Sequence, residues 1–189
     1  MNDPALARRN RIALIVLLAL FLGGLVAAAV LRFSGWRPAG MKNKGELLQP
    51  YGDLRNYRPV LADGKQYGWH DDPRTWRIVV APQDCAGARA QACTRLLEQL
   101  DTVWQLQGRE ADRVHLLWAG SLPAGAVAPR VLRQVDPEPA LLAQLPRPGL
   151  DGGDPAWLVD PNGFVILRYA PGFDPGDLRT DLARLLKIN

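Results

Sequence analysis

The chain has 189 residues, of which 48% are hydrophobic and 22% charged, a composition typical of one folded domain plus a further segment. Two cysteines and two distant histidines, His70 and His115, exclude a disulfide-dense scaffold and a four-cysteine zinc site. The formal net charge is +4, but the first 44 residues carry +6 and the remaining 145 carry −2. This distribution argues against nucleic acid as a partner, because a phosphate binder needs its basic residues on the folded domain.

A long hydrophobic run lies close to the N-terminus. Residues 12–31 contain no charge, and 20 residues of helix at ~1.5 Å per residue cross the ~30 Å hydrocarbon core of a bilayer. We therefore predict an N-terminal tail over 1–11 and a transmembrane helix over 12–31. The alanines at 27–29 also resemble the cleavage site of a secretory signal, but the run exceeds the usual ~7–15 apolar residues of such signals, which favours an uncleaved anchor.

The orientation of this anchor follows from the chain around it. Basic residues lie on both sides of the run and compete. A short tail ahead of a long domain is typical of a signal anchor, and long domains translocate largely regardless of charge. We therefore expect the C-terminal domain to lie outside the cytoplasmic membrane.

The soluble part begins without a regular pattern. Residues 32–75 are rich in Gly, Pro and polar residues, so we expect a juxtamembrane linker and an irregular entry segment. The β-branched and aromatic residues over 75–81 then predict a buried strand. Apolar residues at helical spacing predict a helix over 90–107, and residues 112–119 predict a second strand. This order implies a right-handed parallel crossover.

The remaining sequence predicts short elements and then a hairpin. A short strand at 130–132 and one or two helical turns at 138–144 precede a loop rich in Pro and Gly. Residues 156–160 and 164–169 predict antiparallel strands, because Gly163 can take the positive φ that closes the turn between them.

A terminal helix completes the predicted fold. Asp174 is suited to cap this helix. Its buried stripe is expected to contain Leu178, Leu182, Leu185 and Leu186. A βαβ unit followed by a β-hairpin and a helix is the order of the thioredoxin core. We therefore predict an α/β, thioredoxin-like domain over 76–189.

The candidate chemistry lies in the two cysteines. Cys85 follows the first predicted strand and precedes the helix, where helix amides stabilise a thiolate. Residues eight apart on one helix lie ~12 Å apart along its axis, whereas a disulfide needs Cα atoms ~4.4–6.8 Å apart. Pairing with Cys93 therefore requires Cys85 to lie in a loop that folds back, with Gly87 providing the break. If the helix begins at Ala86, no bond can form.

Three interpretations of these cysteines remain open. In the first, Cys93 is a buried apolar residue and Cys85 is incidental or part of a structural disulfide. In the second, Cys85 and Cys93 are the catalytic pair of a thiol–disulfide oxidoreductase. In the third, the same two residues are metal ligands for Cu(I), a soft ion that two thiolates can hold. A compartment that oxidises thiols favours some form of pairing.

Few other residues suggest chemistry. His115 lies in a predicted strand among apolar neighbours and is expected to be structural, and His70 is expected in a surface loop. The Asp154–Pro155 bond directly precedes the third predicted strand, where thioredoxin folds carry a cis proline. Both isomers remain open here.

Several segments resemble a known group of proteins. They are 42–50, which reads KNKGELLQP, the strand followed by Cys85 and Cys93, and the stretches 158–169 and 181–187. They resemble the membrane-anchored thioredoxin-like proteins of bacterial cytochrome oxidase gene clusters, distant relatives of the Sco/SenC copper chaperones.

This resemblance implies an accessory role in cytochrome c oxidase assembly, handling thiols or Cu(I) for an oxidase subunit. It also implies a bacterial inner-membrane protein whose soluble domain faces the periplasm. Two departures limit it: the cysteines form Cys-x7-Cys, where the chaperones have Cys-x3-Cys, and residues 153–156 lack their histidine ligand. The alternative is a non-catalytic thioredoxin-like module that docks on an oxidase subunit.

Overall fold

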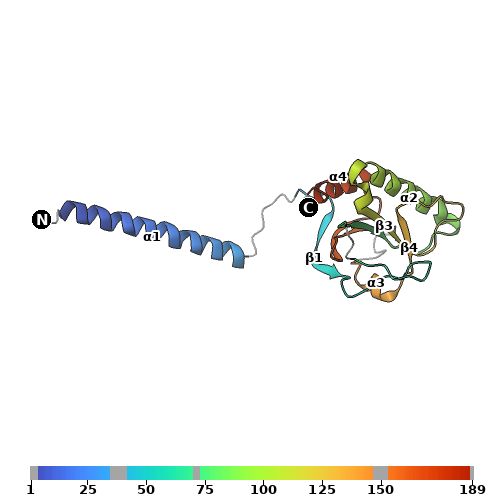
Figure 1. Ribbon diagram of the computed structural model, residues 1–189, viewed down its shortest axis with the longest axis horizontal. Coiled ribbons are helices and arrows are strands. Elements are labelled where there is room, and N and C mark those ends of the chain that lie inside the picture. Colours follow the sequence, from blue (N-terminus) through green and yellow to red (C-terminus); the bar gives the residue numbers. More distant parts are fainter. Residues whose placement is uncertain (1–3, 35–41, 70–72, 147–152, 188–189) are drawn as a thin grey trace. The chain divides into compact units, whose positions relative to one another are not determined.

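The computed structural model describes residues 4–34, 42–69, 73–146 and 153–187 (Figure 1). The chain divides into two compact units, Met1–Lys42 and Asn43–Asn189.

The first unit contains one helix, α1 (Pro4–Phe33). Its stretch Arg8–Phe33 is long and apolar enough to cross a membrane, and the large apolar side chains from Ile12 to Phe33 are exposed. An exposed apolar surface of this size is unusual on a soluble protein, and a bilayer would cover it. A helix over 12–31 is confirmed, and it extends into the predicted tail because no residue between Pro4 and that run interrupts a helix.

The second unit is built on one six-stranded sheet with the order β1-β6-β5-β2-β3-β4. The strands are β1 (Glu46–Asp53), β2 (Trp76–Val80), β3 (Val114–Ala119), β4 (Leu132–Val135), β5 (Ala156–Val159) and β6 (Phe164–Tyr169). β2, β3 and β4 are parallel, and β5, β6 and β1 add to the other side as antiparallel neighbours. The predicted parallel crossover and the hairpin, which Gly163 closes at φ 101°, are both confirmed.

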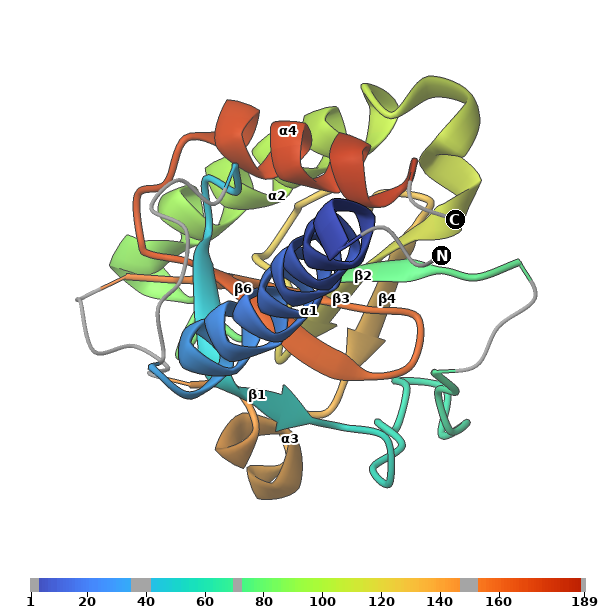
Figure 2. The ribbon, with the colours of Figure 1, turned by 90° about the vertical axis from the view of Figure 1, so that its left-hand side faces the viewer.

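Helices cover both faces of this sheet. α2 (Ala90–Gln105) and α4 (Pro175–Leu185) lie together on one face, and the short α3 (Pro139–Ala143) lies on the other (Figure 2). Two 3-10 helices, η1 (Gly87–Arg89) and η2 (Gly108–Arg113), flank α2. Asp174 caps α4 as predicted, since its carboxylate accepts a hydrogen bond from the Gly176 amide at 2.7 Å.

The core forms two layers, one on each side of the sheet. Side chains alternate along a strand, so Ile78 packs in the layer under α2 and α4, whereas Val79 packs in the opposite layer. Both residues are fully buried. β2 is buried on both faces and is apolar except for Arg77, and its β-branched and aromatic residues made it predictable.

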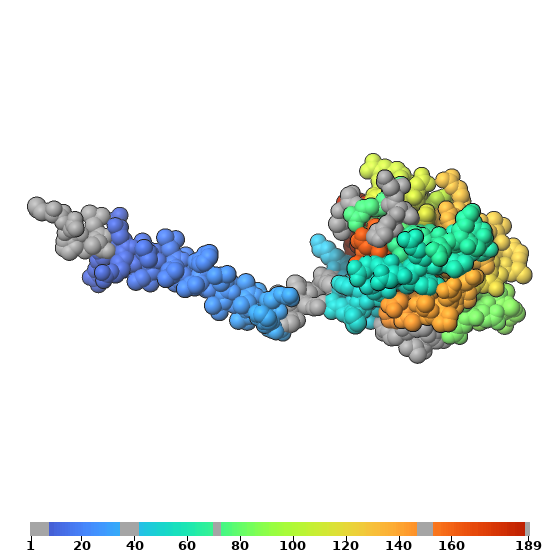
Figure 3. Space-filling model, turned by 60° about the horizontal axis from the view of Figure 1, so that its bottom comes forward, coloured from blue at the N-terminus to red at the C-terminus, as the bar shows by residue number. Residues whose placement is uncertain are grey.

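The prediction of an irregular linker and entry segment over 32–75 is wrong for one part of that range. β1 lies within it and pairs with β6, with Leu47 opposite Leu167. A register irregularity between Leu47 and Gly52, around Pro50, breaks the two-residue alternation that would indicate a strand. Residues 54–69 then lie across the second face beside α3 (Figure 3), where Leu54, Tyr67 and Trp69 are buried. The compact unit therefore begins near residue 43.

A buried carboxylate joins the start of this unit to its end. Asp181 on α4 is 2% exposed, and its Oδ2 accepts hydrogen bonds from the amides of Lys44 and Gly45 at 2.7 and 2.8 Å. The Tyr169 hydroxyl donates to the same oxygen at 2.9 Å. Burial and, to a smaller extent, this hydrogen bond raise the pKa of Tyr169, so the phenol stays a donor at neutral pH. The segments 42–50 and 181–187, both part of the family resemblance, meet at this carboxylate.

Candidate functional site

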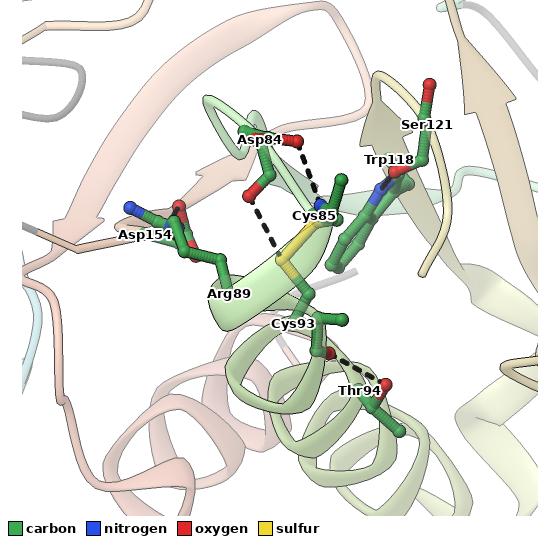
Figure 4. Close-up of a disulfide and its surroundings, with 10 residues drawn as sticks. Asp84, Cys85, Arg89, Cys93, Thr94, Trp118, Ser121 and Asp154 are labelled. Carbon is green, nitrogen blue, oxygen red and sulfur yellow. Dashed lines mark hydrogen bonds and ion pairs between the residues drawn. A yellow bond between two sulfur atoms is a disulfide. The ribbon is translucent and has the colours of Figure 1, made fainter. Parts of the chain in front are cut away.

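Cys85 and Cys93 form a disulfide with a Cα–Cα separation of 5.7 Å (Figure 4). Cys85 lies in the turn between β2 and η1, and α2 begins only at Ala90. Gly87 has φ +54°, a left-handed conformation that glycine adopts without steric cost. The chain thus folds back over the start of α2, which is the condition that the sequence set for pairing.

The two sulfurs differ in their surroundings. Cys93 is fully buried in the layer under α2 and α4, and Cys85 is 6% exposed, which makes Cys85 the more accessible of the two. Cys93 Sγ lies 3.6 Å from the Asp84 carbonyl oxygen. The Asp84 side chain accepts a hydrogen bond from the Ala86 amide at 2.8 Å and so fixes the turn that carries Cys85.

An ion pair holds the loop between the two cysteines. Arg89 Nη2 lies 2.6 Å from both carboxylate oxygens of Asp154, whose side chain is only 7% exposed. The negative partner compensates the Arg89 guanidinium, which reduces any stabilisation of a thiolate at Cys85 by that charge. Among the described residues the cis bond is Gln49–Pro50, so the bond between Asp154 and Pro155 is trans.

The histidines do not join the cysteines. His115 faces the second core layer, on the opposite side of the sheet from the disulfide, and its Nδ1 lies 2.7 Å from the Tyr67 hydroxyl. This placement fits the predicted structural role. His70 lies outside the described residues. Within 4–34, 42–69, 73–146 and 153–187, no three His, Cys, Asp or Glu side chains are grouped so that they could hold a metal ion.

A groove of about 610 Å³ lies beside Cys85, and sequence reasoning missed it. Three segments that follow β2, β3 and β4 form its walls, together with one side chain of α3. Carboxyl ends of parallel strands lie at one edge of a sheet, where open α/β folds bind ligands. The parallel crossover was a signal that could have indicated this edge. The lining residues are Ala81, Pro82, Gln83, Asp84, Cys85, Ala119, Gly120, Ser121, Gln134, Val135, Asp136, Pro137 and Leu142.

Comparison with known families gives the same fold. A family model described as the transmembrane-like, thioredoxin-like, C-terminal domain matches residues 76–189. The chain belongs to this family. The match starts at the predicted domain boundary, although the compact unit of the structure also includes β1.

Solved structures share the architecture at low sequence identity. BsSco, a member of the Sco family of cytochrome c oxidase assembly proteins in which a disulfide switch was identified, is 11% identical, with a TM-score of 0.51 over 79% of this chain and 99% of that chain. Arabidopsis thaliana ScoI with copper bound is 12% identical, with a TM-score of 0.51 over 70% and 97%. No curated protein sequence matches the chain. The thioredoxin-like fold is confirmed, and these Sco proteins share it.

Proposed function

We propose that this chain is a membrane-anchored thiol–disulfide exchange protein that assists cytochrome c oxidase assembly through Cys85 and Cys93. The observation that carries the proposal is the disulfide itself, which joins one sulfur at the wall of a groove to a second sulfur in the core. BsSco, which has the same fold, belongs to a family of oxidase assembly proteins and contains a disulfide switch. The apolar α1 and the oxidised pair support an inner-membrane protein whose domain faces the periplasm.

The exchange proceeds through a mixed disulfide. A partner thiolate attacks Cys85 Sγ, the Cys85–Cys93 bond breaks, and Cys93 leaves as a thiolate that takes a proton from water. A second partner thiolate then attacks the partner sulfur of the mixed disulfide and releases Cys85 as a thiolate, which also takes up a proton. The partner is oxidised to a disulfide by two electrons and the pair is reduced. The new Cys93 thiol can donate to the Asp84 carbonyl, which lies 3.6 Å away.

Redox titration of the full chain in a non-ionic detergent tests the chemistry. Two thiols should appear together as the glutathione potential falls, and a mixed disulfide should form at Cys85 in Cys93→Ser. Glu98→Gln, an exposed change on α2, is the control and should titrate like the parent. A pair that resists glutathione at every ratio would contradict the proposal.

Complementation tests the biological role. In cells that lack the parent gene, Cys85→Ser/Cys93→Ser should fail to restore oxidase assembly, whereas Glu98→Gln should restore it. Full assembly with the double variant would leave the docking module as the function.

Transport of Cu(I) by the reduced pair is the second candidate. The observation that favours it is the convergence of two sulfurs, which suffices for two-coordinate Cu(I). The residues do not fit a Cu(II) site of the Sco kind, because Asp154, in the stretch that corresponds to the Sco histidine, has its carboxylate engaged by Arg89. A competition titration of the reduced chain against a chromophoric Cu(I) chelator should give one ion per pair and none for Cys85→Ser.

A further inference from the structure

The groove beside Cys85 presents an acidic surface to whatever approaches the disulfide. Its charged lining residues are Asp84 and Asp136, both exposed, and none of its lining residues is basic. Cys85 forms part of the wall and Cys93 does not. An extended chain seated in this groove therefore meets Cys85, Asp84 and Asp136 within one surface.

The opposite side of the disulfide has a different character. Figure 4 shows Arg89 and Asp154 on one side of the sulfur pair and Trp118 and Ser121 on the other. Arg89 and Asp154 neutralise each other. The carboxylates of the groove have no basic lining residue to compensate them, so the charge that lines the groove is negative.

We infer that this groove binds the cysteine-bearing segment of the partner and selects a segment with lysine or arginine beside its cysteine. The inference rests on the proposed function and adds the chemical class of its substrate. A cationic neighbour would bring the attacking sulfur to Cys85 by charge attraction to Asp136, and an acidic neighbour would be repelled. The bond changes are those of the first exchange step: the peptide sulfur bonds to Cys85 and Cys93 is released.

Rates of mixed-disulfide formation test the inference in the oxidised full chain in non-ionic detergent. The probes are two nine-residue peptides, each with one cysteine, flanked by lysines in one and by glutamates in the other. Quenched samples are resolved by mass spectrometry to place the bond on Cys85. A lysine neighbour also raises the thiolate fraction of a peptide, so the measured quantity is the lysine-to-glutamate rate ratio of each variant relative to the parent protein.

Asp136→Asn is the test variant and Asp112→Asn the matched control. Asp112 carries the same charge on a 79% exposed side chain in η2, just before the amino end of β3 and away from the groove. Asp136→Asn should lower the rate ratio about fivefold at low salt, and Asp112→Asn should leave it unchanged. Near 1 M salt, where the screening length is ~3 Å, the parent protein and Asp136→Asn should give the same lysine-to-glutamate rate ratio.

Each outcome is decisive. A ratio that Asp136→Asn leaves unchanged, or that both variants lower equally, overturns the groove inference while the proposed exchange function stands. Failure of both peptides to bond to Cys85 overturns both. As a control, the reduced parent protein and the reduced variants are each reacted with a small neutral disulfide. An unchanged reaction rate shows that Asp136→Asn keeps the cysteine site intact.

Discussion

The chain closes on itself in two places that differ in kind. The disulfide joins residues eight apart with a covalent bond between two buried cysteines. Asp181 joins residues 136 and 137 apart through hydrogen bonds to a buried carboxylate. A covalent link across a short loop lowers the conformational entropy of the unfolded chain only slightly, and this stabilises the folded domain by about 2.5 kcal/mol. From this comparison we expect that opening the covalent link costs less stability than removing the hydrogen-bonded one.

Removing the carboxylate should have the largest effect. Asp181→Ala leaves the buried donors of Lys44, Gly45 and Tyr169 without their acceptor, so we expect a loss of about 3–5 kcal/mol in unfolding free energy. Urea unfolding of the full chain in detergent measures it. The matched control, Asp177→Ala on the same helix, removes a half-exposed carboxylate and should cost less than about 1 kcal/mol. Equal losses in the two variants would remove the distinction between the two closures.

Opening the disulfide should have a smaller effect. Reduction should lower the unfolding free energy by about 2.5 kcal/mol while the helical circular dichroism signal is kept. Urea unfolding with and without reductant makes the comparison, and Cys85→Ser/Cys93→Ser serves as the control because reductant should leave it unchanged. Loss of the fold on reduction would identify the link as structural and argue against cycling.

The sequence predicted the elements whose periodicity is local and missed those assembled from distant segments. Val79, Leu117 and Trp157 lie in predominantly apolar strands, and Gly163 marks a tight turn, so the crossover and the hairpin were predictable. Pro50 lies within the register irregularity of β1 and concealed that strand.

In the candidate site too, features set within one segment could be predicted and contacts between distant segments could not. The spacing of Cys85 and Cys93 set a geometric condition for pairing that Gly87 satisfies in the structure, but the sequence alone left open whether the bond forms. The ion pair of Arg89 with Asp154 joins residues 65 apart in the chain, and the groove combines the ends of three strands. No pattern within one segment encodes contacts of this kind.

The ion pair beside the disulfide provides an intermediate test. Asp154→Asn removes the negative partner of Arg89 in the loop between the cysteines, and we expect a loss of about 1–2 kcal/mol, since Arg89 is partly exposed. A looser loop keeps the two thiols together less often, so the equilibrium with glutathione should shift up to about tenfold towards the dithiol. Arg95→Gln, an exposed change on α2, is the control. An unchanged equilibrium constant would show that the disulfide turn is held without this pair.

The smallest effect is expected at the exposed pair of Asp53 and Arg55. Two hydrogen bonds lower the pKa of Asp53 to about 2: the larger effect comes from the Arg55 side chain and the smaller from the Arg55 backbone amide. A lowered folded-state pKa contributes stability above the unfolded value, and that contribution is lost as the pH falls from near 4 through about 2. Arg55→Gln should raise the pKa of Asp53 in a carboxyl NMR titration and leave glutathione exchange unchanged. An unshifted pKa would contradict the assigned hydrogen bond.

The hydrogen bonds from the Lys44 and Gly45 amides to Asp181 determine how the domain bears a pulling force. Any pull that reaches the domain through the preceding chain arrives first at these two amides, before it reaches β1. The load is then shared with α4, so the outermost strand is shielded from peeling. A domain held in this way should resist unfolding from its N-terminal strand when force is applied through the preceding chain.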